Sequence, residues 1–357
     1  AIARRLLQEA KLRNRFKQEV LEGSMAASAW FGKIDEGGKH LTHKGAKVHP
    51  SAVVHPAAAI DEGADIGPMC MVGAGVLIGR DVKLRSHIVV ESGTIIGDGC
   101  EVHPFTVLGG PPQDLKFRGE NSWLMIGERN VIREHVTINV GTEGGGYSTQ
   151  IGSDNLIMSG VHIAHDCRVG DRVIISTGTS LAGHVSVEDE AILGGLCGVR
   201  QWVRIGSGAM VGGKSAVQLD VLPYSLVSGC PALTQGLNLV GLRRRGASKE
   251  EIAAMQRQLK YLLGGGQGTT SAGPCAHASS SSSSVRAEEE HGSCSGTLPS
   301  WRPTLQARGE ALKQHLEEAG KERGEGSLAA SAVTCGHKAV RLRAMKMVEF
   351  VLRRSKL

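Results

Sequence analysis

Aliphatic residues recur at every sixth position over most of the chain. The series starts at position 48, is interrupted after positions 108 and 138, and then runs unbroken from position 151 to 217. Glycine or another small or polar residue follows most of these anchors. A period of six is typical of a β-helix, in which each hexapeptide forms one short strand and one turn. The anchors are Val48, Val54, Ile60, Ile66, Val72, Ile78, Leu84, Val90, Ile96, Val102, Leu108, Ile126, Ile132, Ile138, Ile151, Ile157, Ile163, Val169, Ile175, Leu181, Val187, Leu193, Val199, Ile205, Val211 and Val217.

Three hexapeptides close one triangular coil of 18 residues. The repeat therefore predicts an all-β left-handed parallel β-helix whose anchors point inward and stack from coil to coil. Residues that are 18 positions apart then lie one above the other, at the strand spacing of about 4.8 Å. This geometry places Gly183 above His165 and Gln201 above Gly183, with His184 beside the same column.

Two stretches break the period, at residues 109–125 and 139–150. The first leaves 18 positions between anchors, so we expect about one coil of chain to leave the wall as a loop. Loops on a regular scaffold are where binding residues are often placed. The first stretch carries Asp114 and Lys116, and the second is rich in glycine.

The composition agrees with a β-helix of small side chains. Aromatic residues make up 3% of the chain and there are 49 glycines, so we expect an interior of small and β-branched residues. Cys70, Cys100, Cys167 and Cys197 each follow an anchor by four positions, which predicts buried core residues rather than reactive thiols. The eight cysteines show no CxxC pair and no metal-ligand spacing, which indicates reduced thiols.

Charge and hydropathy exclude two classes of partner. The net charge of +6 is spread along the chain, which argues against nucleic acid and fits an anionic small molecule or an acidic partner. No apolar run approaches the length of about 18 residues that a membrane span needs, so we expect no stable membrane insertion.

We expect three segments along the chain. Residues 1–46 form a leader, targeting or linker segment, residues 47–224 form the β-helix, and residues 225–357 form a C-terminal α-helical domain. In that domain Ser248 and Glu251 form a capping box before Ile252, Met255, Leu259 and Leu262, which have helical spacing. Further helical patterns occur at 303–320 and 338–354. Residues 264–300 are a low-complexity insert that we expect to be disordered.

The first 22 residues carry six basic and three acidic residues and could form an amphipathic helix. They resemble an organelle-targeting leader, although such leaders usually contain few acidic residues. We therefore predict an organelle, a mitochondrion in preference to a plastid, or the cytoplasm if the protein is bacterial.

Five motifs occur in the order and spacing of one enzyme family. They are "QDLKFRGE" (113–120), "HIAHDC" (162–167), "LAGHVSV" (181–187), "VGGKS" (211–215) and "GLNLVGLRRRG" (236–246). The sequence resembles the UDP-N-acetylglucosamine O-acyltransferases, which begin lipid A biosynthesis. The resemblance covers about 47–262 and returns in "MVEFVLRRSKL" at the end of the chain, whereas the low-complexity insert has no counterpart.

The resemblance implies a reaction and its partners. The family moves an (R)-3-hydroxyacyl group from acyl carrier protein to the 3-hydroxyl of UDP-N-acetylglucosamine, without a metal or cofactor. A sugar hydroxyl is a poor nucleophile, so a base must take its proton, and an imidazole suits this role at neutral pH. The matched positions imply that His165 is the base, that Asp166 orients it, and that Gly183 stabilises the oxyanion. We also expect a homotrimer, because the predicted prism has flat faces and its strip of site residues lies on one corner.

The resemblance also assigns the other matched positions. Two residues of the first loop hold the sugar and its diphosphate, three contact the sugar and the acyl chain, three bind the nucleotide, and a glycine sets the acyl length. In that order, these residues are Asp114 and Lys116; His162, His184 and Gln201; Asn238, Arg244 and Arg245; and Gly213.

Three other functions remain open at this point. The related N-acyltransferase of the same pathway normally carries a separate N-terminal sugar-binding domain, for which residues 1–46 are too short. A β-helical carbonic anhydrase needs three histidines around zinc, with a spacing that His162 and His165 do not have. The third alternative is a non-catalytic trimeric β-helix scaffold. The sequence thus predicts an acid/base centre rather than a metal site.

Overall fold

The computed structural model describes residues 41–263 together with 310, 313, 346–347 and 349–351. Residues 1–40 of the expected leader and the low-complexity insert lie outside the described residues, so the localisation stays a prediction. The chain divides into two compact units, residues 1–246 and 247–357, which are described separately below.

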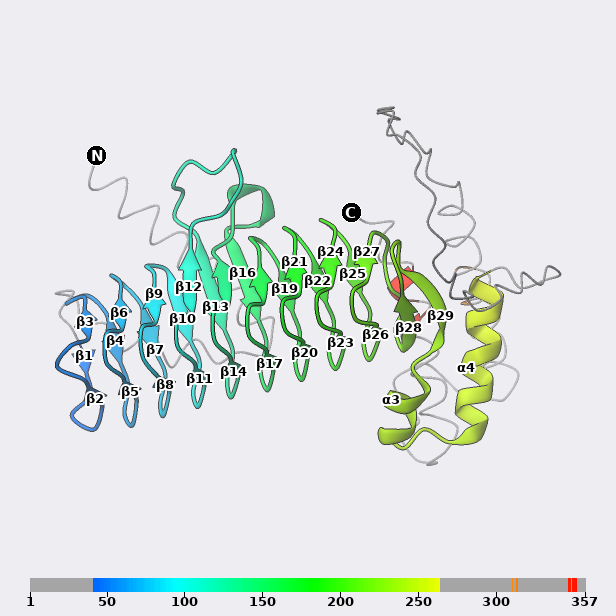
Figure 1. The fold of residues 1–357 in the computed structure, drawn as a ribbon, viewed down its shortest axis with the longest axis horizontal. Coiled ribbons are helices and arrows are strands. Elements are labelled where there is room, and N and C mark those ends of the chain that lie inside the picture. The colour runs from blue at the N-terminus through cyan, green and yellow to red at the C-terminus, as the bar shows by residue number, and fades with distance from the viewer. Residues whose placement is uncertain (1–40, 264–309, 311–312, 314–345, 348, 352–357) are drawn as a thin grey trace, which may run out of the picture. The chain divides into compact units, whose positions relative to one another are not determined.

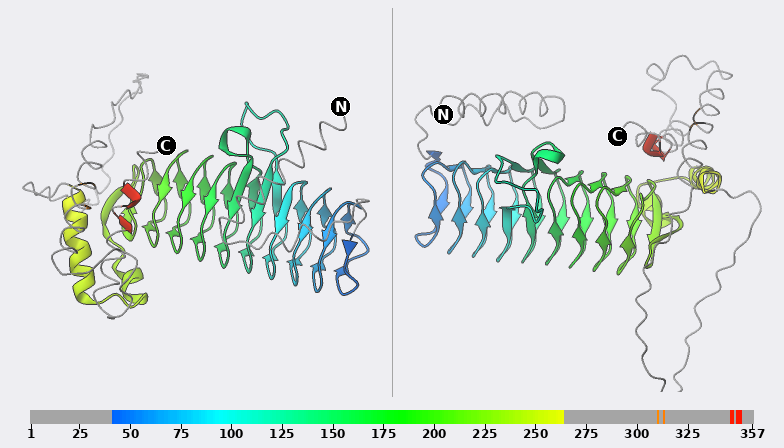
Figure 2. Two further views of the ribbon diagram at one scale, coloured as in Figure 1. Left: turned by 180° about the vertical axis from the view of Figure 1, so that it is seen from behind. Right: turned by 90° about the horizontal axis from the view of Figure 1, so that it is seen from above.

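The first unit is a left-handed parallel β-helix, as the six-residue period predicts (Figure 1). Its short strands wind in turn through three sheets, named A, B and C. Each strand from β1 to β27 pairs in parallel with the strands of adjoining coils, and β29 adds to β28 in the antiparallel direction. Views from behind and from above show the coils following one another in chain order (Figure 2).

The strands of each sheet come from successive coils. Sheet A contains Leu41–Thr42 (β1), Ala59–Ile60 (β4), Leu77–Ile78 (β7), Thr94–Ile96 (β10), Trp123–Ile126 (β13), Ser148–Ile151 (β16), Arg168–Val169 (β19), Ser186–Val187 (β22) and Arg204–Ile205 (β25). Sheet B contains Lys47–Val48 (β2), Asp65–Ile66 (β5), Lys83–Leu84 (β8), Glu101–Val102 (β11), Val131–Ile132 (β14), Leu156–Ile157 (β17), Ile174–Ile175 (β20), Ile192–Leu193 (β23), Met210–Val211 (β26), Ser225–Ser228 (β28) and Leu233–Leu237 (β29). Sheet C contains Val53–Val54 (β3), Met71–Val72 (β6), Val89–Val90 (β9), Val107–Gly110 (β12), Thr137–Asn139 (β15), His162–Ile163 (β18), Ser180–Leu181 (β21), Gly198–Val199 (β24) and Ala216–Val217 (β27).

The anchors form one continuous core along the axis of the β-helix. Every anchor from Ile60 to Val217 is buried, because the side chains of a strand alternate between its two faces and the anchor always faces inward. Val48 and Val54 are more exposed, since β2 and β3 are the first strands of their sheets and have a coil on one side only.

The four cysteines expected in the core are buried. Cys100 donates a hydrogen bond to the Gly127 carbonyl at 3.0 Å. Burial raises the pKa of Cys100 to about 11 and that of Cys167 to about 12, because a thiolate is poorly solvated there. These thiols fill space in the core.

The boundaries of the β-helix are wider than expected. β1 precedes residue 47, and β28 and β29 extend sheet B through residue 237, beyond the expected end at 224. The first described helix is therefore α3 (Leu239–Arg244), and it still belongs to the first unit. The aliphatic period stops at Val217 because these last strands are longer and less regular, which is why the sequence placed the boundary too early.

Both breaks in the period occur at the same corner of the prism. We name the corners by the sheets that they connect, so the chain passes from sheet C to sheet A at the C–A corner. The first excursion (residues 111–122) connects β12 to β13, and the second excursion (residues 140–147) connects β15 to β16. Figure 1 shows both rising from one edge. The first is a loop of twelve residues, shorter than the full coil expected.

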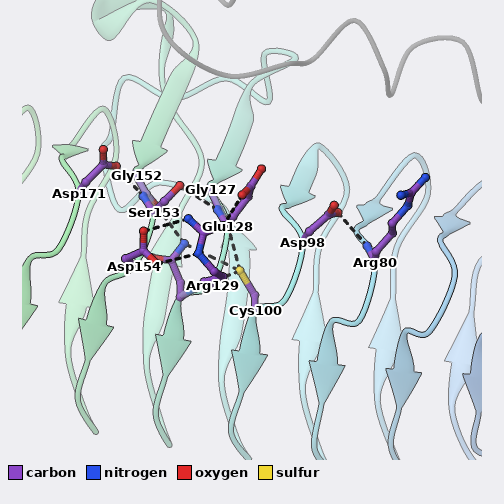
Figure 3. Close-up of polar contacts among 11 residues, drawn as sticks. Arg80, Asp98, Cys100, Gly127, Glu128, Arg129, Gly152, Ser153, Asp154 and Asp171 are labelled. Carbon is purple, nitrogen blue, oxygen red and sulfur yellow. Dashed lines mark hydrogen bonds and ion pairs between the residues drawn. The ribbon is translucent and has the colours of Figure 1, made fainter.

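Polar and charged side chains follow one another along the A–B corner, and Figure 3 shows Arg129 among them with its partners Glu128 and Asp154. The Arg129 guanidinium donates hydrogen bonds to both Asp154 oxygens at 2.8 and 3.0 Å. One coil further on, Arg172 lies 3.3 Å from Glu190, so positive and negative side chains alternate along this corner. Exposed pairs of this kind contribute little to stability individually, and the pairing of the strands carries the fold.

The second unit contains α4 (Lys249–Leu262). Its N-terminus has the expected capping box, in which Ser248 accepts from the Glu251 amide and the Glu251 carboxylate accepts from the Ser248 amide. Met255, Leu259 and Leu262 are buried, as their spacing predicts, and the described residues among 310–351 are helical. Among the described residues, no helix has both the length and the apolar character that crossing a bilayer requires.

Candidate active site

Two adjacent residues of the "HIAHDC" motif form a hydrogen-bonded pair at the C–A corner. His165 and Asp166 follow β18, and both side chains are almost fully buried. The Nδ1 atom of His165 lies 2.7 Å from Oδ2 of Asp166. An ionised carboxylate only accepts hydrogen bonds, so Nδ1 carries the hydrogen and Nε2 of His165 is left as the acceptor. This is the arrangement that a general base requires.

The second excursion holds the carboxylate of Asp166 in place. The Thr142 amide donates to Oδ1 at 2.8 Å and the Thr142 hydroxyl donates to Oδ2 at 2.6 Å. The Asp166 amide in turn donates to Thr149 Oγ1 at 2.8 Å. Gly145 packs directly on the carboxylate, and a Cβ there would lie 2.0 Å from Asp166 Cγ, so no other residue fits.

His184 occupies the next coil of the same corner. Its Nε2 atom lies 3.7 Å from Asp166 Oδ2, and its ring meets that of His165 edge-on with centroids 5.1 Å apart. On its other side the His184 ring stacks on the indole of Trp202. Asp166, His184 and Trp202 all have positive φ, between 61° and 66°, because each occupies the same position in the turn of successive coils.

The environment favours the neutral form of the neighbouring histidines. Burial lowers the pKa of His162, and the charge of a protonated His165 lowers it further. The His162 Nδ1 atom also lies 2.8 Å from Thr137 Oγ1. Burial lowers the pKa of His184 as well, although the negative charge of Asp166 opposes this. Burial therefore disfavours the charged forms of both His162 and His184.

Gly183 lies against the face of His165, as the 18-residue period predicts. A Cβ at this position would lie 2.5 Å from Cε1 and 2.7 Å from Nε2 of His165, so only glycine leaves room for the ring. Among the described residues no acceptor is found for the Gly183 amide.

The first excursion carries Asp114 and Lys116 toward this cluster. Asp114 Oδ1 accepts from the Lys116 amide at 3.0 Å, which fixes the turn between them. The charges of both residues act on the pKa of His184, with Asp114 raising it and Lys116 lowering it. Glu120 ties this excursion to the second one, since its carboxylate accepts from the Glu143 amide at 3.3 Å.

The remaining predicted residues lie apart from the pair. Gln201 is exposed beside Trp202 at the C–A corner. Gly213 is exposed at the B–C corner, on the opposite edge of sheet C, and a Cβ there would meet only the Gly195 backbone at 3.4 Å or more. The space beside Gly213 is therefore open, and its role in acyl length stays a prediction.

The three residues predicted to bind the nucleotide lie at and around α3. Asn238 caps the helix by accepting from the Gly241 amide at 2.9 Å, and it donates to the Gly208 carbonyl at 3.1 Å. Arg245 pairs with the Glu190 carboxylate and donates to its carbonyl at 2.9 Å. Arg244 is exposed. The structure therefore uses the side chains of Asn238 and Arg245 to hold α3 on the coils.

One group of donor atoms among the described residues has the proximity that a metal site needs. It consists of one atom each from His165, Asp166 and His184, all within 4.8 Å of one another. However, the Asp166 oxygens already accept three hydrogen bonds, from Thr142 and His165. The geometry fits a hydrogen-bonded acid/base centre better than a set of ligands.

The sequence interpretation missed Thr142, Thr149, Gly145 and Trp202, which contact Asp166 or His184. One signal would have located the second excursion. Leu108, Ile138 and Ile163 follow one another at every third anchor, and three hexapeptides make one full coil. Both breaks in the period and the turn of the "HIAHDC" motif therefore lie at one corner of the prism.

Two family models match the chain. One is described as Udp N-acetylglucosamine O-acyltransferase, domain 2, and matches residues 220–288. The other is described as bacterial transferase hexapeptide (six repeats) and matches residues 148–183, which contain the His165–Asp166 pair.

Similar proteins include acyl-[acyl-carrier-protein]–UDP-N-acetylglucosamine O-acyltransferases of two bacteria. The Paracoccus denitrificans protein is 56% identical over 168 residues, which are 47% of this chain but only 63% of that relative. The match thus spans less than two thirds of its length. The Rhizobium rhizogenes protein is 46% identical over 183 residues, which are 51% of this chain and 68% of the relative.

A solved structure extends the similarity to the fold. The crystal structure of UDP-N-acetylglucosamine O-acyltransferase from Moraxella catarrhalis aligns with a TM-score of 0.63 and 35% sequence identity. The alignment covers 77% of this chain and 93% of that chain.

Proposed function

The chain belongs to the UDP-N-acetylglucosamine O-acyltransferase family, and we propose that it transfers an (R)-3-hydroxyacyl group from acyl carrier protein to the 3-hydroxyl of UDP-N-acetylglucosamine. The product would enter lipid A biosynthesis. The observation that carries the proposal is the buried His165–Asp166 pair, whose free Nε2 lies against Gly183.

His165 is the general base in this reaction. Asp166 holds the Nδ1 hydrogen, which fixes the ring and leaves Nε2 to take the proton from the sugar hydroxyl as its oxygen attacks the thioester carbonyl. The imidazolium that forms is stabilised by the adjacent carboxylate. General-base catalysis contributes about 10²–10⁴-fold to a rate, so this pair is the main determinant of turnover.

Attack converts the thioester carbonyl into a tetrahedral oxyanion. The Gly183 amide is the proposed donor to this oxyanion, because the residue lies beside His165 without a side chain in the way. When the intermediate collapses, the C–S bond breaks and the thiolate of the carrier takes the proton back from His165. The products are the 3-O-acyl sugar nucleotide and the free carrier thiol, and no metal or cofactor takes part.

The remaining residues bind the two substrates. Asp114 and Lys116 are proposed to hold the sugar and its diphosphate from the first excursion, since a lysine ammonium suits a phosphate. His184 and Gln201 at the same corner, and His162 in β18 beside it, are proposed as further contacts to the sugar and the acyl chain. Gly213, at the other edge of sheet C, is proposed to leave the path of the acyl chain open.

The nucleotide end of the site is proposed to lie at α3. There Arg244 offers an exposed guanidinium whose fork matches phosphate oxygens. Asn238 and Arg245 act with it by keeping α3 in place through Gly208 and Glu190. We propose a homotrimer as the working assembly, with acidic acyl carrier protein as its transient partner.

The experiment is a direct assay of acyl transfer. The protein is incubated with UDP-N-acetylglucosamine and a panel of 3-hydroxyacyl carrier proteins, and the products are identified by mass. A product that carries one acyl group and loses it in mild base is an ester and supports the proposal. In a parallel assay with an amino-sugar nucleotide as acceptor, a base-stable amide would indicate the related N-acyltransferase. No product with any donor would favour the scaffold.

A further inference from the structure

The Oδ2 atom of Asp166 lies at the centre of three side chains. It accepts from the Thr142 hydroxyl at 2.6 Å and from His165 Nδ1 at 2.7 Å, while Nε2 of His184 lies 3.7 Å away. A carboxylate oxygen has two lone pairs. Thr142 and His165 therefore use both, and His184 is left outside hydrogen-bonding distance.

Removal of the Thr142 hydroxyl would vacate one of these lone pairs. The nearest donor is His184, whose ring already faces the carboxylate and would need to move by less than about 1 Å to reach hydrogen-bonding distance. A protonated His184 would form an ion pair with Asp166 and compete with His165 for the same oxygen. The base would then lose part of the interaction that fixes its ring and its tautomer.

We propose that Thr142 is a positioning residue of this site: its hydroxyl occupies the lone pair of Asp166 that His184 would otherwise take, and so reserves the carboxylate for His165. The kinetic part of this inference rests on the proposed function. The competition of His165 and His184 for Asp166 does not, because it exists in the protein without substrate.

The position of Thr142 also links the carboxylate to the substrate loop. Thr142 begins the short 3₁₀ turn of the second excursion, and the amide of the next residue, Glu143, donates to Glu120 of the first excursion. The two excursions and Asp166 thus form one hydrogen-bonded path. Burial raises the pKa of Glu120, but hydrogen bonds from backbone amides, including those of Arg118 and Glu143, outweigh this and lower it, so the link is made by an ionised carboxylate.

The titratable and charged groups around the pair limit what else could respond to pH. They are His162, His184, Asp114 and Lys116. His162 and Asp114 keep their partners in a Thr142 variant, and the exposed Lys116 is unaffected by it, so His184 is the one of the four that is expected to change. A change in the pH response of such a variant therefore reports on the sharing of Asp166.

The experiment compares Thr142→Val, Thr142→Ser and a matched control. Valine keeps the shape and the backbone amide but removes the hydroxyl, whereas serine keeps the hydroxyl. Thr106→Val is the control, because buried Thr106 donates a similar hydrogen bond to the Arg133 carbonyl at 2.8 Å, at a different corner. The measurements are kcat and KM for UDP-N-acetylglucosamine against pH, and nitrogen-15 NMR titration of the histidine rings without substrate.

For Thr142→Val we expect the acidic limb of kcat to move to lower pH by roughly half to one unit, because His165 then shares the carboxylate with a protonated His184 and its imidazolium is less stabilised. At neutral pH, kcat falls about 5–10-fold, the scale of one hydrogen bond to a charged group, and KM changes less than about twofold. The His184 ring titrates at higher pH than in the wild type, because it gains the carboxylate, and the His165 ring titrates at lower pH. Thr142→Ser and Thr106→Val keep the wild-type limb.

An unchanged acidic limb and unchanged ring titrations in Thr142→Val would overturn the proposal, as would equal losses in the valine and serine variants. If Thr142→Val does not fold, Thr142→Ala removes the hydroxyl without adding a branched side chain and takes its place. If the wild-type protein transfers no acyl group, the proposed function fails, but the NMR titrations still decide the role of Thr142.

Discussion

The imidazole of His184 and the indole of Trp202 lie parallel, with ring centroids 3.8 Å apart and an angle of 4° between their planes. The indole is more than half exposed at the C–A corner, so it covers His184 from the solvent side. The imidazole is held with its edge toward Asp166 and its face against Trp202. The ring next to the proposed base is therefore held by its packing against Trp202.

Replacement of His165 should abolish most of the proposed activity. We expect His165→Ala to lower kcat by about 10²–10⁴-fold with little change in KM, because the lost group acts in the chemical step. His55→Ala is the matched control, since His55 is an exposed corner histidine that only accepts from the Ala57 amide. Near-normal turnover in His165→Ala would indicate that His165 has a structural role. Loss of wild-type activity on treatment with a chelator would indicate that the histidines bind a metal.

Gly183→Ala should impair catalysis without unfolding the protein. The added Cβ would lie 2.5 Å from His165 Cε1, and a contact that short must displace the ring from Asp166. We expect kcat to fall at least about tenfold, the effect of losing an aligned base. Gly198→Ala, where a Cβ meets nothing within 4 Å, should stay close to wild type. Steady-state kinetics and melting temperatures of both variants test this, and equal behaviour of the two would contradict it.

Lys116→Ala should weaken substrate binding more than it slows chemistry. The Lys116 side chain is exposed on the first excursion, where it is proposed to contact the diphosphate, and the backbone turn with Asp114 remains. We expect KM for UDP-N-acetylglucosamine to rise about tenfold, as for one charge-assisted contact, with kcat within about threefold. Lys83→Ala, on sheet B, serves as the control. A large fall in kcat at unchanged KM would assign Lys116 to the chemical step instead.

Stability should fall as the pH drops below about 6.5. The pKa values of His162 and His184 lie below their ordinary value of 6.5 in the folded protein. The unfolded chain therefore binds more protons in this range, so stability is highest above pH 6.5 and is lost as the pH falls toward the folded values. Urea midpoints between about pH 8 and pH 5 measure this. The double variant His162→Gln/His184→Gln should show a shallower slope; an unchanged slope would contradict the assignment.

Alkylation should separate buried from exposed thiols. At about pH 8, iodoacetamide reacts with accessible thiolates, so we expect rapid labelling of exposed Cys230 in the native protein. Mass spectrometry of peptides should show Cys70, Cys100, Cys167 and Cys197 unlabelled until denaturant is added, because they are buried. Fast native labelling of Cys100 or Cys167 would show that the β-helix opens readily.

Most of the fold could be predicted from the repeat, because each hexapeptide forms the same strand and turn. The residues from Ile60 to Val217 that obey the period are all buried, and the column from His165 to Gly183 follows from 18-residue stacking alone. The prediction failed at residues 225–237, where β28 and β29 pair without an aliphatic period.

The site was harder to predict where it depends on irregular chain. The hydrogen bond of His165 to Asp166 joins neighbours in a motif, whereas Thr142 reaches Asp166 from a glycine-rich loop whose path no period describes. Arg245 lies in a recognisable motif, but its partner could not be predicted. A motif resemblance implied a role for its charge, but the partner Glu190 is 55 positions away and becomes visible only when the chain is folded.

The pairing of every coil with its immediate neighbours also determines when the reaction centre can form. The hydrogen bonds that fix Asp166 join residues separated by 1, 17 and 24 positions, so closing these contacts costs little chain entropy. Proteins with such short-range contacts fold quickly, and in a repeat fold winding can spread from any pair of adjacent coils. His165 and Asp166 can therefore reach their final geometry on the ribosome while the helices that follow are still being synthesised.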